Sequence, residues 1–311
     1  MKNFIVVSFT SSLFCFGYSP EAFSMYQDVP KTSVSPVRKS FLDTQLGINS
    51  TVVATTERIY KKINKNWTYV EPGCQMSTQS AFWLPKWIKG TVIVDGEKQN
   101  TKIPSLLLKT EPDNLIAALE DLLDKPAKLE CTIALTTAKI FCLKEILGEE
   151  LFNRYAKAFY KLLNETQGWD IEQFFHELPL QFITNEQGES VPGSFTYITN
   201  IPLYPYFKPN GNGMGDNVIC MSQDRYLGFG EIYKDAPKPL DVIEAEYLKL
   251  FNKTEEVERD VENHKKISEK FISDRNKFIE MRRKSQENQE LHQIFNIKEV
   301  NHFIKTGEIY I

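Results

Sequence analysis

One segment, CTIALTTAKIFCLKEIL from Cys131 to Leu147, restricts the fold of this chain more than any other. Its apolar residues occur nearly all round a helical projection instead of along one stripe. A helix that is apolar on every side has to be enclosed by other elements. The sequence therefore predicts a central, buried helix that begins near Glu130 or Cys131.

Composition narrows the class of protein. The chain has 311 residues, of which 41% are hydrophobic and 25% are charged, as in ordinary globular proteins. Its net charge of −4 argues against nucleic-acid binding, which uses a basic surface. Five cysteines are too few for a disulfide scaffold in a chain of 311 residues.

The first residues, 1–24, have the order of a secretory signal peptide. Lys2 precedes an apolar run from Phe4 to Phe16, and the small residues Ala22 and Ser24 follow. The run is too short for a stable membrane span. We therefore expect an exported protein, secreted or periplasmic. The alternative is a buried N-terminal strand, because residues 5–7 are β-formers.

The rest of the chain divides into three parts by composition. Residues 25–72 are predicted to be a loose N-terminal arm, because their first half is rich in Ser, Pro, Thr and Asp without a period. Residues 73–239 form the predicted main domain: apolar residues follow helical spacing at 113–125 and 149–164, and turn-bounded β segments come after about residue 180.

Residues 240–311 are predicted to be a charged helical extension. Charged residues dominate from Asp241 to Gln293, and this stretch has neither proline nor glycine. Such a composition favours long helices that face solvent. Phe271, Ile272, Phe278 and Ile279 indicate that one side packs on the main domain.

Cys131, directly after Glu130, is the candidate nucleophile. The start of a helix presents unpaired backbone N–H groups and the positive end of the dipole, which lower the pKa of a thiol. The same N–H groups can bind the oxyanion that forms when sulfur attacks an amide. The alternative is that Cys131 simply packs in the core, which is the commoner fate of a free cysteine.

A thiol nucleophile needs a proton partner, and histidine would be usual. Of the four histidines, His176 follows a predicted helix, His264, His292 and His302 lie in the charged region, and the β region has none. A partly desolvated carboxylate can serve instead. Asp216, in the glycine-rich segment GMGDNVI, is the candidate, with a plain turn residue as the alternative.

Four pieces stand in order between Ala127 and Tyr233: AKLECTIALTTAKIFCLKEILGEELFNRYAKAF, LNETQGWD, VPGSFTYITN and GMGDNVICMSQDRYLGFG. Together they resemble the bacterial spore-coat type of protein-glutamine γ-glutamyltransferase. Glu130-Cys131 matches the family's Glu-Cys pair at the head of its central helix. Gly215-Asp216-Asn217 matches its Gly-Glu-Asn loop with Asp in place of Glu, and Trp169 falls where the family has a Trp.

Two positions depart from the family pattern. Phe229 stands where the family has the histidine of a Gly-His-Gly motif, and Met214 replaces a tryptophan two residues before the loop acid. An aspartate is also one methylene shorter than a glutamate. Altered substrate choice or loss of activity would be consistent with these changes.

The resemblance implies an α+β fold of the NlpC/P60-like, papain-like type, with an antiparallel sheet packed on a central helix. Cys131 would form a thioester with a protein glutamine, Asp216 would shuttle protons and Glu130 would polarise the site. A lysine amine would then give an isopeptide crosslink, and water would give deamidation.

Trp169, Met214, Asn217 and Phe229 would contact the substrate. The implied partners are proteins that carry glutamine and lysine, with no cofactor and no nucleic acid, and no metal-ligand spacing occurs.

Two alternatives remain. A cysteine amidase or peptidase of the same fold would need a histidine near the sheet. A catalytically inactive binding protein would keep the fold and use its charged C-terminal helices to engage a partner; the loss of a polar group at Phe229 favours it.

Overall fold

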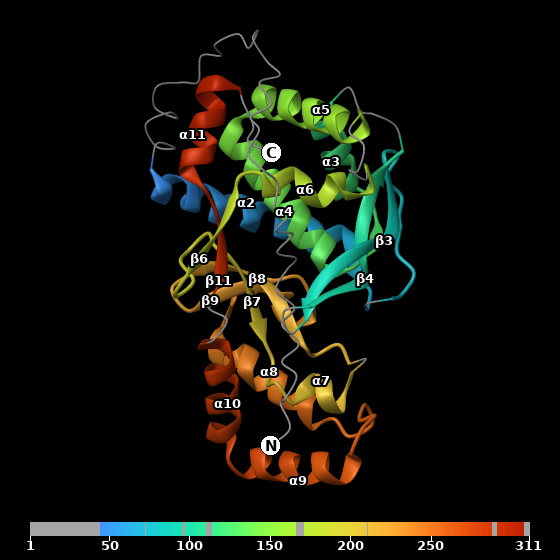
Figure 1. The fold of residues 1–311 in the computed structure, drawn as a ribbon, viewed down its shortest axis with the longest axis vertical. Helices are drawn as coiled ribbons and strands as arrows, with labels where there is room; N and C mark the ends of the chain where they lie inside the picture. The colour runs from blue at the N-terminus through green and yellow to red at the C-terminus, as the bar shows by residue number, and fades with distance from the viewer. Residues whose placement is uncertain are drawn as a thin grey trace.

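The computed structural model describes residues 44–71, 73–94, 97–109, 114–165, 171–209, 211–287 and 291–307. The expected signal peptide, residues 1–24, lies outside these ranges. The chain has a mixed α+β fold, which confirms the class predicted from the sequence, and helices lie on both sides of a central sheet (Figure 1). Within the described residues, no helix combines the length and apolar character needed to cross a bilayer.

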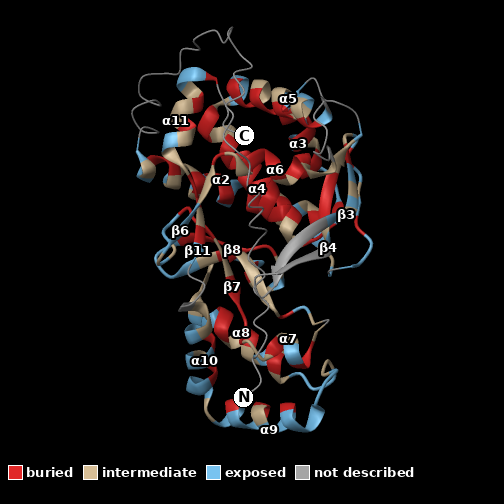
Figure 2. Ribbon diagram, in the orientation of Figure 1, coloured by how far each residue is buried: buried red, intermediate tan, exposed pale blue. Residues whose placement is uncertain are grey.

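The predicted central helix is α4, Cys131–Leu147. Every residue from Ile133 to Leu143 is buried, and α4 runs through the red interior of the upper part in Figure 2. It is enclosed by α2 (Gln45–Asn66), α5 (Glu149–Glu165) and α6 (Phe174–Leu180). The all-round apolar pattern is thus satisfied by neighbours on each side, as expected for a helix of this kind.

The expected loose arm at residues 25–72 is corrected over residues 45–66, which form helix α2, while residues 25–43 lie outside the described ranges. The 22 residues of α2 begin at an N-cap in which the side chain of Thr44 accepts a hydrogen bond from Gly47 N. One side buries Ile48, Val52 and Ile59 against α4. The apolar residues of α2 follow helical spacing, but the lysines and threonines between them made this pattern hard to recognise in the sequence.

The main sheet has six strands in the order β10-β9-β8-β7-β11-β6, and all of its neighbours pair antiparallel. The strands are β6 (Ile183–Gln187), β7 (Phe195–Thr199), β8 (Gly215–Ser222), β9 (Arg225–Gly228), β10 (Lys238–Pro239) and β11 (Leu291–Phe295). The expected hairpin after the glycine-rich loop is β8–β9. Asp216 therefore lies on a central strand.

Two smaller sheets complete the upper part. The hairpin β3–β4 joins Trp83–Val94 to Glu97–Leu108, and the parallel pair β1–β5 joins Trp67–Tyr69 to Ala127–Leu129, with β2 (Ser77–Thr78) on its edge. Helix α3 covers Leu115–Asp124. The short elements are η1 (Ile171–Gln173), α7 (Tyr204–Phe207) and η2 (Glu231–Tyr233).

Residues 240–311 are not a simple helical extension, because they also contain strand β11 of the main sheet. This corrects the prediction of a purely helical C-terminal region. Helices α8 (Leu240–Asn252), α9 (Val261–Ser273) and α10 (Arg275–Glu287) lie below the sheet in Figure 1, opposite α4. The chain then returns: β11 inserts between β7 and β6, and α11 (Ile297–Thr306) packs beside α5. The local sequence of β11 does not indicate this pairing, because its partner strands lie about 100 residues earlier in the chain.

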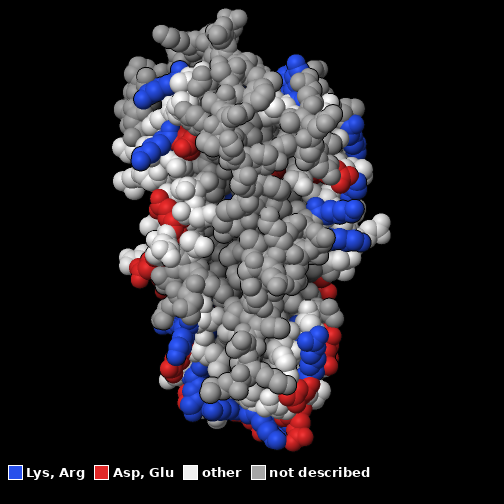
Figure 3. All heavy atoms as spheres, viewed as in Figure 1, with Lys and Arg blue, Asp and Glu red and all other residues white. Residues whose placement is uncertain are grey.

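Helices α8 to α10 have their own small core. Phe271 and Phe278 are expected to pack on the main domain, but they are buried together against Phe251 of α8, and Ile272 is 69% exposed. On the face shown in Figure 3, basic and acidic side chains lie interspersed at the lower end, where α9 and α10 are found. The charges therefore cover a packed module and do not form a patch of one sign on that face.

Substitution of α2 tests its place in the core. We expect Ile59→Ala to lower the free energy of unfolding by about 2–5 kcal/mol, because the side chain is fully buried. The matched change Leu46→Ala, on the same helix but 76% exposed, should change it by about 0.5 kcal/mol or less. Urea unfolding measures both, and equal effects would contradict the packing described.

Candidate active site at the start of α4

Glu130 and Cys131 lie where β5 ends and α4 begins. Glu130 is the N-cap residue, and its backbone is extended (φ −79°, ψ 151°). Its Oε2 accepts a hydrogen bond from Thr132 N at 2.6 Å, which pairs one amide that the first turn would leave free. Its Oε1 lies 3.0 Å from Cys131 Sγ and accepts from the thiol. The same carboxylate therefore caps the first turn of α4 and accepts a hydrogen bond from the thiol.

The geometry of Asp216 is set by tight packing around β8. Gly215 precedes it, and a Cβ there would lie 2.5 Å from the carbonyl oxygen of Ile198, so this position needs glycine. Asp216 Oδ2 accepts from Tyr247 Oη at 3.1 Å and from Tyr233 Oη at 3.2 Å. Its carboxylate therefore points toward α8 and η2 while its backbone stays in the sheet.

Asp216 acts on Cys131 through its charge. The negative charge of Asp216 contributes to raising the pKa of the Cys131 thiol. Tyr197 and Tyr233 respond to both groups, since the charges of each raise the pKa of these phenols. Within the described residues no hydrogen bond joins the sulfur to the acid. Cys131 and Asp216 therefore share an electrostatic environment with the phenols of Tyr197 and Tyr233.

The ionisation of the thiol differs from the sequence-based expectation. We expected the helix start to lower the pKa of Cys131. Burial instead raises the pKa of Cys131 well above the ordinary thiol value, and the charges of Glu130 and then Asp216 raise it further. Burial, together with the two carboxylates, outweighs the effect expected from the dipole of one helix end. Cys131 is therefore protonated at neutral pH and gives up its proton only to a base.

The pKa of Asp216 is shifted in the predicted direction. Burial raises the pKa of Asp216 above the ordinary aspartate value, while the hydrogen bonds from Tyr247 and Tyr233 oppose that rise. Phenol donors stabilise the ionised carboxylate, so their presence or loss sets its proton affinity. Asp216 therefore binds a proton more tightly than an exposed aspartate does.

One backbone donor at the start of α4 remains free for a ligand. Thr132 N is taken by Glu130, and Ile133 N donates to the carbonyl of Glu130 at 3.1 Å. Cys131 N, at the first helical position, has no acceptor among the residues that the structure describes. This N–H lies beside the sulfur, where an oxyanion would form after attack on a carbonyl.

The remaining predicted substrate residues have different positions. Met214 and Asn217 flank Asp216 and are partly exposed, whereas Trp169 lies outside the described residues. The prediction for Phe229 is wrong: its side chain is 4% exposed and packs at 5.9 Å from the ring of Tyr60. A large apolar ring at the end of β9 gains more from the core than from solvent.

Sequence reasoning missed the tyrosines of this site. Tyr69 and Tyr197 are partly exposed, and the charge of Cys131 helps to raise the pKa of both. Tyr233 and Tyr247 hold Asp216 from elements that looked unrelated to it, a short turn and a charged helix. The enrichment in aromatic residues was visible, but nothing local distinguished these phenols from core rings.

The histidines are engaged elsewhere. His176 Nε2 lies 2.7 Å from the carbonyl of Pro104 and its Nδ1 lies 3.3 Å from Thr136 Oγ1. Burial lowers the pKa of His176 to about 4, so it is neutral at pH 7. His264 is hydrogen bonded to Phe251 O, in the small lower core. Neither bonds to Cys131.

Among the described residues, no three His, Cys, Asp or Glu side chains form a group suited to a metal ion. The described cysteines, Cys74, Cys131, Cys142 and Cys220, are all free. Comparison of the chain with protein-family models and with curated proteins finds no match.

Alkylation of Cys131 tests the electrostatics of the site. At neutral pH we expect iodoacetamide to label Cys131 more slowly than the exposed Cys74, as read by peptide mass spectrometry. Glu130→Gln removes an adjacent negative charge, lowers the pKa of the thiol, and should speed labelling by about tenfold. Glu145→Gln, near the other end of α4, is the matched control. An unchanged rate in Glu130→Gln would refute this account.

Proposed function

We propose that this protein is a cysteine acyltransferase of the protein-glutamine γ-glutamyltransferase type, on a core related to the NlpC/P60-like, papain-like fold. The observation that carries the proposal is the 3.0 Å hydrogen bond from Cys131 Sγ to Glu130 Oε1, at a helix start that also feels the charge of Asp216. A thiol, a base and a second acid in one neighbourhood are what acyl transfer through sulfur requires.

The arrangement of elements supports the proposed core. A buried helix begins with the cysteine, and an antiparallel sheet packs against it and carries the acid on β8. The order of these parts along the chain agrees with the resemblance that the sequence suggests. The helices α8 to α10 would then be an addition to that core.

In the first half of the reaction, Cys131 Sγ attacks the side-chain carboxamide carbon of a glutamine. Glu130 takes the thiol proton as the S–C bond forms, because the thiol is not ionised beforehand. The free Cys131 N–H binds the oxyanion. Glu130 then returns the proton to the amide nitrogen, the C–N bond breaks, and ammonia leaves a thioester.

In the second half, a lysine amine attacks the thioester carbon. Asp216 takes the proton that the amine must lose, through the hydroxyl of Tyr233, which bonds to Asp216 and is in electrostatic contact with Cys131. The C–S bond breaks, Asp216 returns this proton to the leaving sulfur through the Tyr233 hydroxyl, the thiol is restored and an isopeptide bond results. Water in place of the amine would give a glutamate.

The charges around the sulfur favour an amine as the second substrate. The ionisable groups that act on the Cys131 thiol are Glu130 and Asp216, both negative. Two carboxylates with phenols beside them attract a cation and repel an anion. The proposed partners are thus proteins that expose glutamine and lysine, and the signal-like residues 1–24 support a location outside the cytosol.

A second candidate is a catalytically inactive binding protein with the same fold. The raised pKa of the Cys131 thiol and the burial of Phe229, which takes the place of a family histidine, favour it. It predicts that no acyl group is ever transferred, so one assay distinguishes the two.

Amine incorporation tests the transferase directly. We expect the protein to attach a fluorescent primary amine to casein, Cys131→Ala to abolish the reaction, and Asp216→Asn to slow it by about 10²-fold. Cys74→Ser, which changes an exposed free cysteine, is the control and should be unaffected. Incorporation that persists in Cys131→Ala would refute the role of this sulfur, and no incorporation by any form would favour the binding protein.

A further inference from the structure

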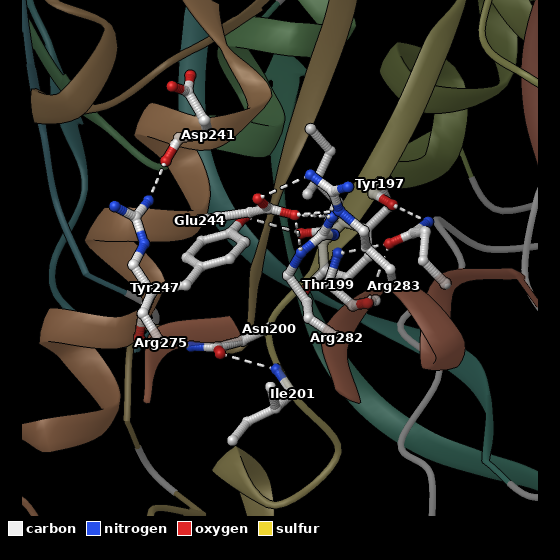
Figure 4. Close-up of polar contacts among 12 residues, drawn as sticks. Tyr197, Thr199, Asn200, Ile201, Asp241, Glu244, Tyr247, Arg275, Arg282 and Arg283 are labelled. Atoms are coloured by element: carbon white, nitrogen blue, oxygen red, sulfur yellow. Dashed lines mark hydrogen bonds and ion pairs between the residues drawn. The ribbon is translucent and has the colours of Figure 1, made fainter. Parts of the chain in front are cut away.

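A buried ion cluster joins α8 to α10 on the side of the sheet opposite α4. Glu244 of α8 is fully buried, and its Oε1 accepts from Arg282 Nε at 3.0 Å, from Arg282 Nη2 at 2.6 Å and from Arg283 Nε at 3.0 Å. Its Oε2 accepts from Arg283 Nη2 at 3.2 Å. Figure 4 shows the two guanidinium groups converging on this one carboxylate.

Helix α8 connects this cluster to Asp216 of the candidate site. Tyr247 is three residues after Glu244, on the same side of the helix, and is also buried. Its hydroxyl lies 3.1 Å from Asp216 Oδ2 and 2.8 Å from the carbonyl oxygen of Ile198, to which Asp216 is paired across β7 and β8. A shift or rotation of α8 would therefore move a hydrogen-bond donor of Asp216.

The cluster also leads to the site along α10. Gln286 is one turn after Arg282 and Arg283, and its Nε2 donates to Tyr197 O at 3.1 Å. Its Oε1 accepts from Thr199 N at 3.1 Å. These bonds hold β7 on either side of Ile198. Helix α10 therefore fixes strand β7, while α8 fixes the side chain of Asp216 through Tyr247.

Stability alone is a weak reason for such a cluster. Buried ion groups lose so much solvation that well-packed apolar residues are often as stable or more so. The hydrogen bonding of this cluster is also incomplete, because Arg282 Nη1 is buried without a hydrogen-bond partner among the described residues. What the cluster does provide is a fixed separation and rotation of α8 relative to α10.

We infer that Glu244, Arg282 and Arg283 are positioning residues for Asp216, acting through Tyr247 and through the hold of Gln286 on β7. This inference rests on the proposed function, since it concerns the acid to which that function gives a proton-carrying role. It assigns to the charged C-terminal helices the task of setting the proton affinity of Asp216. They act from behind the sheet, without touching a substrate.

The test is a titration of the Asp216 carboxyl in the full chain, followed by carbon NMR of ¹³C-labelled aspartate. Its signal is assigned by its loss in Asp216→Asn. We compare Glu244→Gln, Arg283→Gln and Tyr247→Phe with Lys249→Gln, which breaks a solvent-facing pair with Glu246 on the same helix. Circular dichroism confirms that each variant is folded.

Arg283→Gln keeps the test decisive even where Glu244→Gln fails to fold. Arg283 is 55% exposed, and its removal leaves Glu244 balanced by Arg282 alone, while Glu244 Oε2 loses its partner. The charge of the buried pair is thus neutral in that variant. Lys249→Gln also removes one positive charge, so a shift that appears in Arg283→Gln and not in Lys249→Gln reports the orientation of α8.

We expect the Asp216 titration to move to higher pH in Tyr247→Phe and in the cluster variants, because a phenol that stabilises the carboxylate is lost or displaced. Lys249→Gln should leave it unmoved. The pH–rate profile of amine incorporation should move in the same direction.

A shift in Tyr247→Phe alone, or no shift in any folded variant, would overturn the inference. The titration needs no turnover. A wild-type protein that transfers no amine would therefore refute the proposed function and still leave the positioning role decided by the NMR result.

Discussion

The fold depends on the need to enclose α4 on every side. From Ile133 to Leu143 no residue of this helix reaches solvent, so α2, α5 and α6 cover one side and the sheet covers the other. The enclosure leaves the first residue, Cys131, partly exposed, because α4 begins where β5 ends. The position of the candidate nucleophile thus follows from packing, because the chain enters the core directly after Cys131.

The same entry point explains the chemistry of the sulfur. A helix start needs acceptors for its free amides, and Glu130 provides one. The carboxylate that caps the helix therefore lies beside the thiol, raises its pKa and accepts its proton. A site of this kind does not store a thiolate. It keeps a neutral thiol hydrogen bonded to a carboxylate.

The region behind the sheet ties the acid to the rest of the molecule. Tyr247 bonds to Asp216, Gln286 bonds to β7, and the cluster at Glu244 holds α8 and α10 together. The chain then passes into β11, which completes the main sheet between β7 and β6. A segment that reads as a charged appendage is thereby part of both the sheet and the surroundings of Asp216.

The sequence by itself determined what local pattern controls. The all-round apolar period predicted α4 and its start at Cys131, and turn residues predicted the β8–β9 hairpin. The glycines around Asp216 favoured a close approach of the backbone to a ligand, whereas Gly215 packs closely against the carbonyl oxygen of Ile198 on the neighbouring strand. Only the tertiary structure decided which distant groups surround them. The phenols on Asp216, the insertion of β11, the burial of Phe229 and the sign of the pKa shift at Cys131 all depend on contacts between residues far apart in the chain. Burial and charge act through space, and a local pattern carries no record of them.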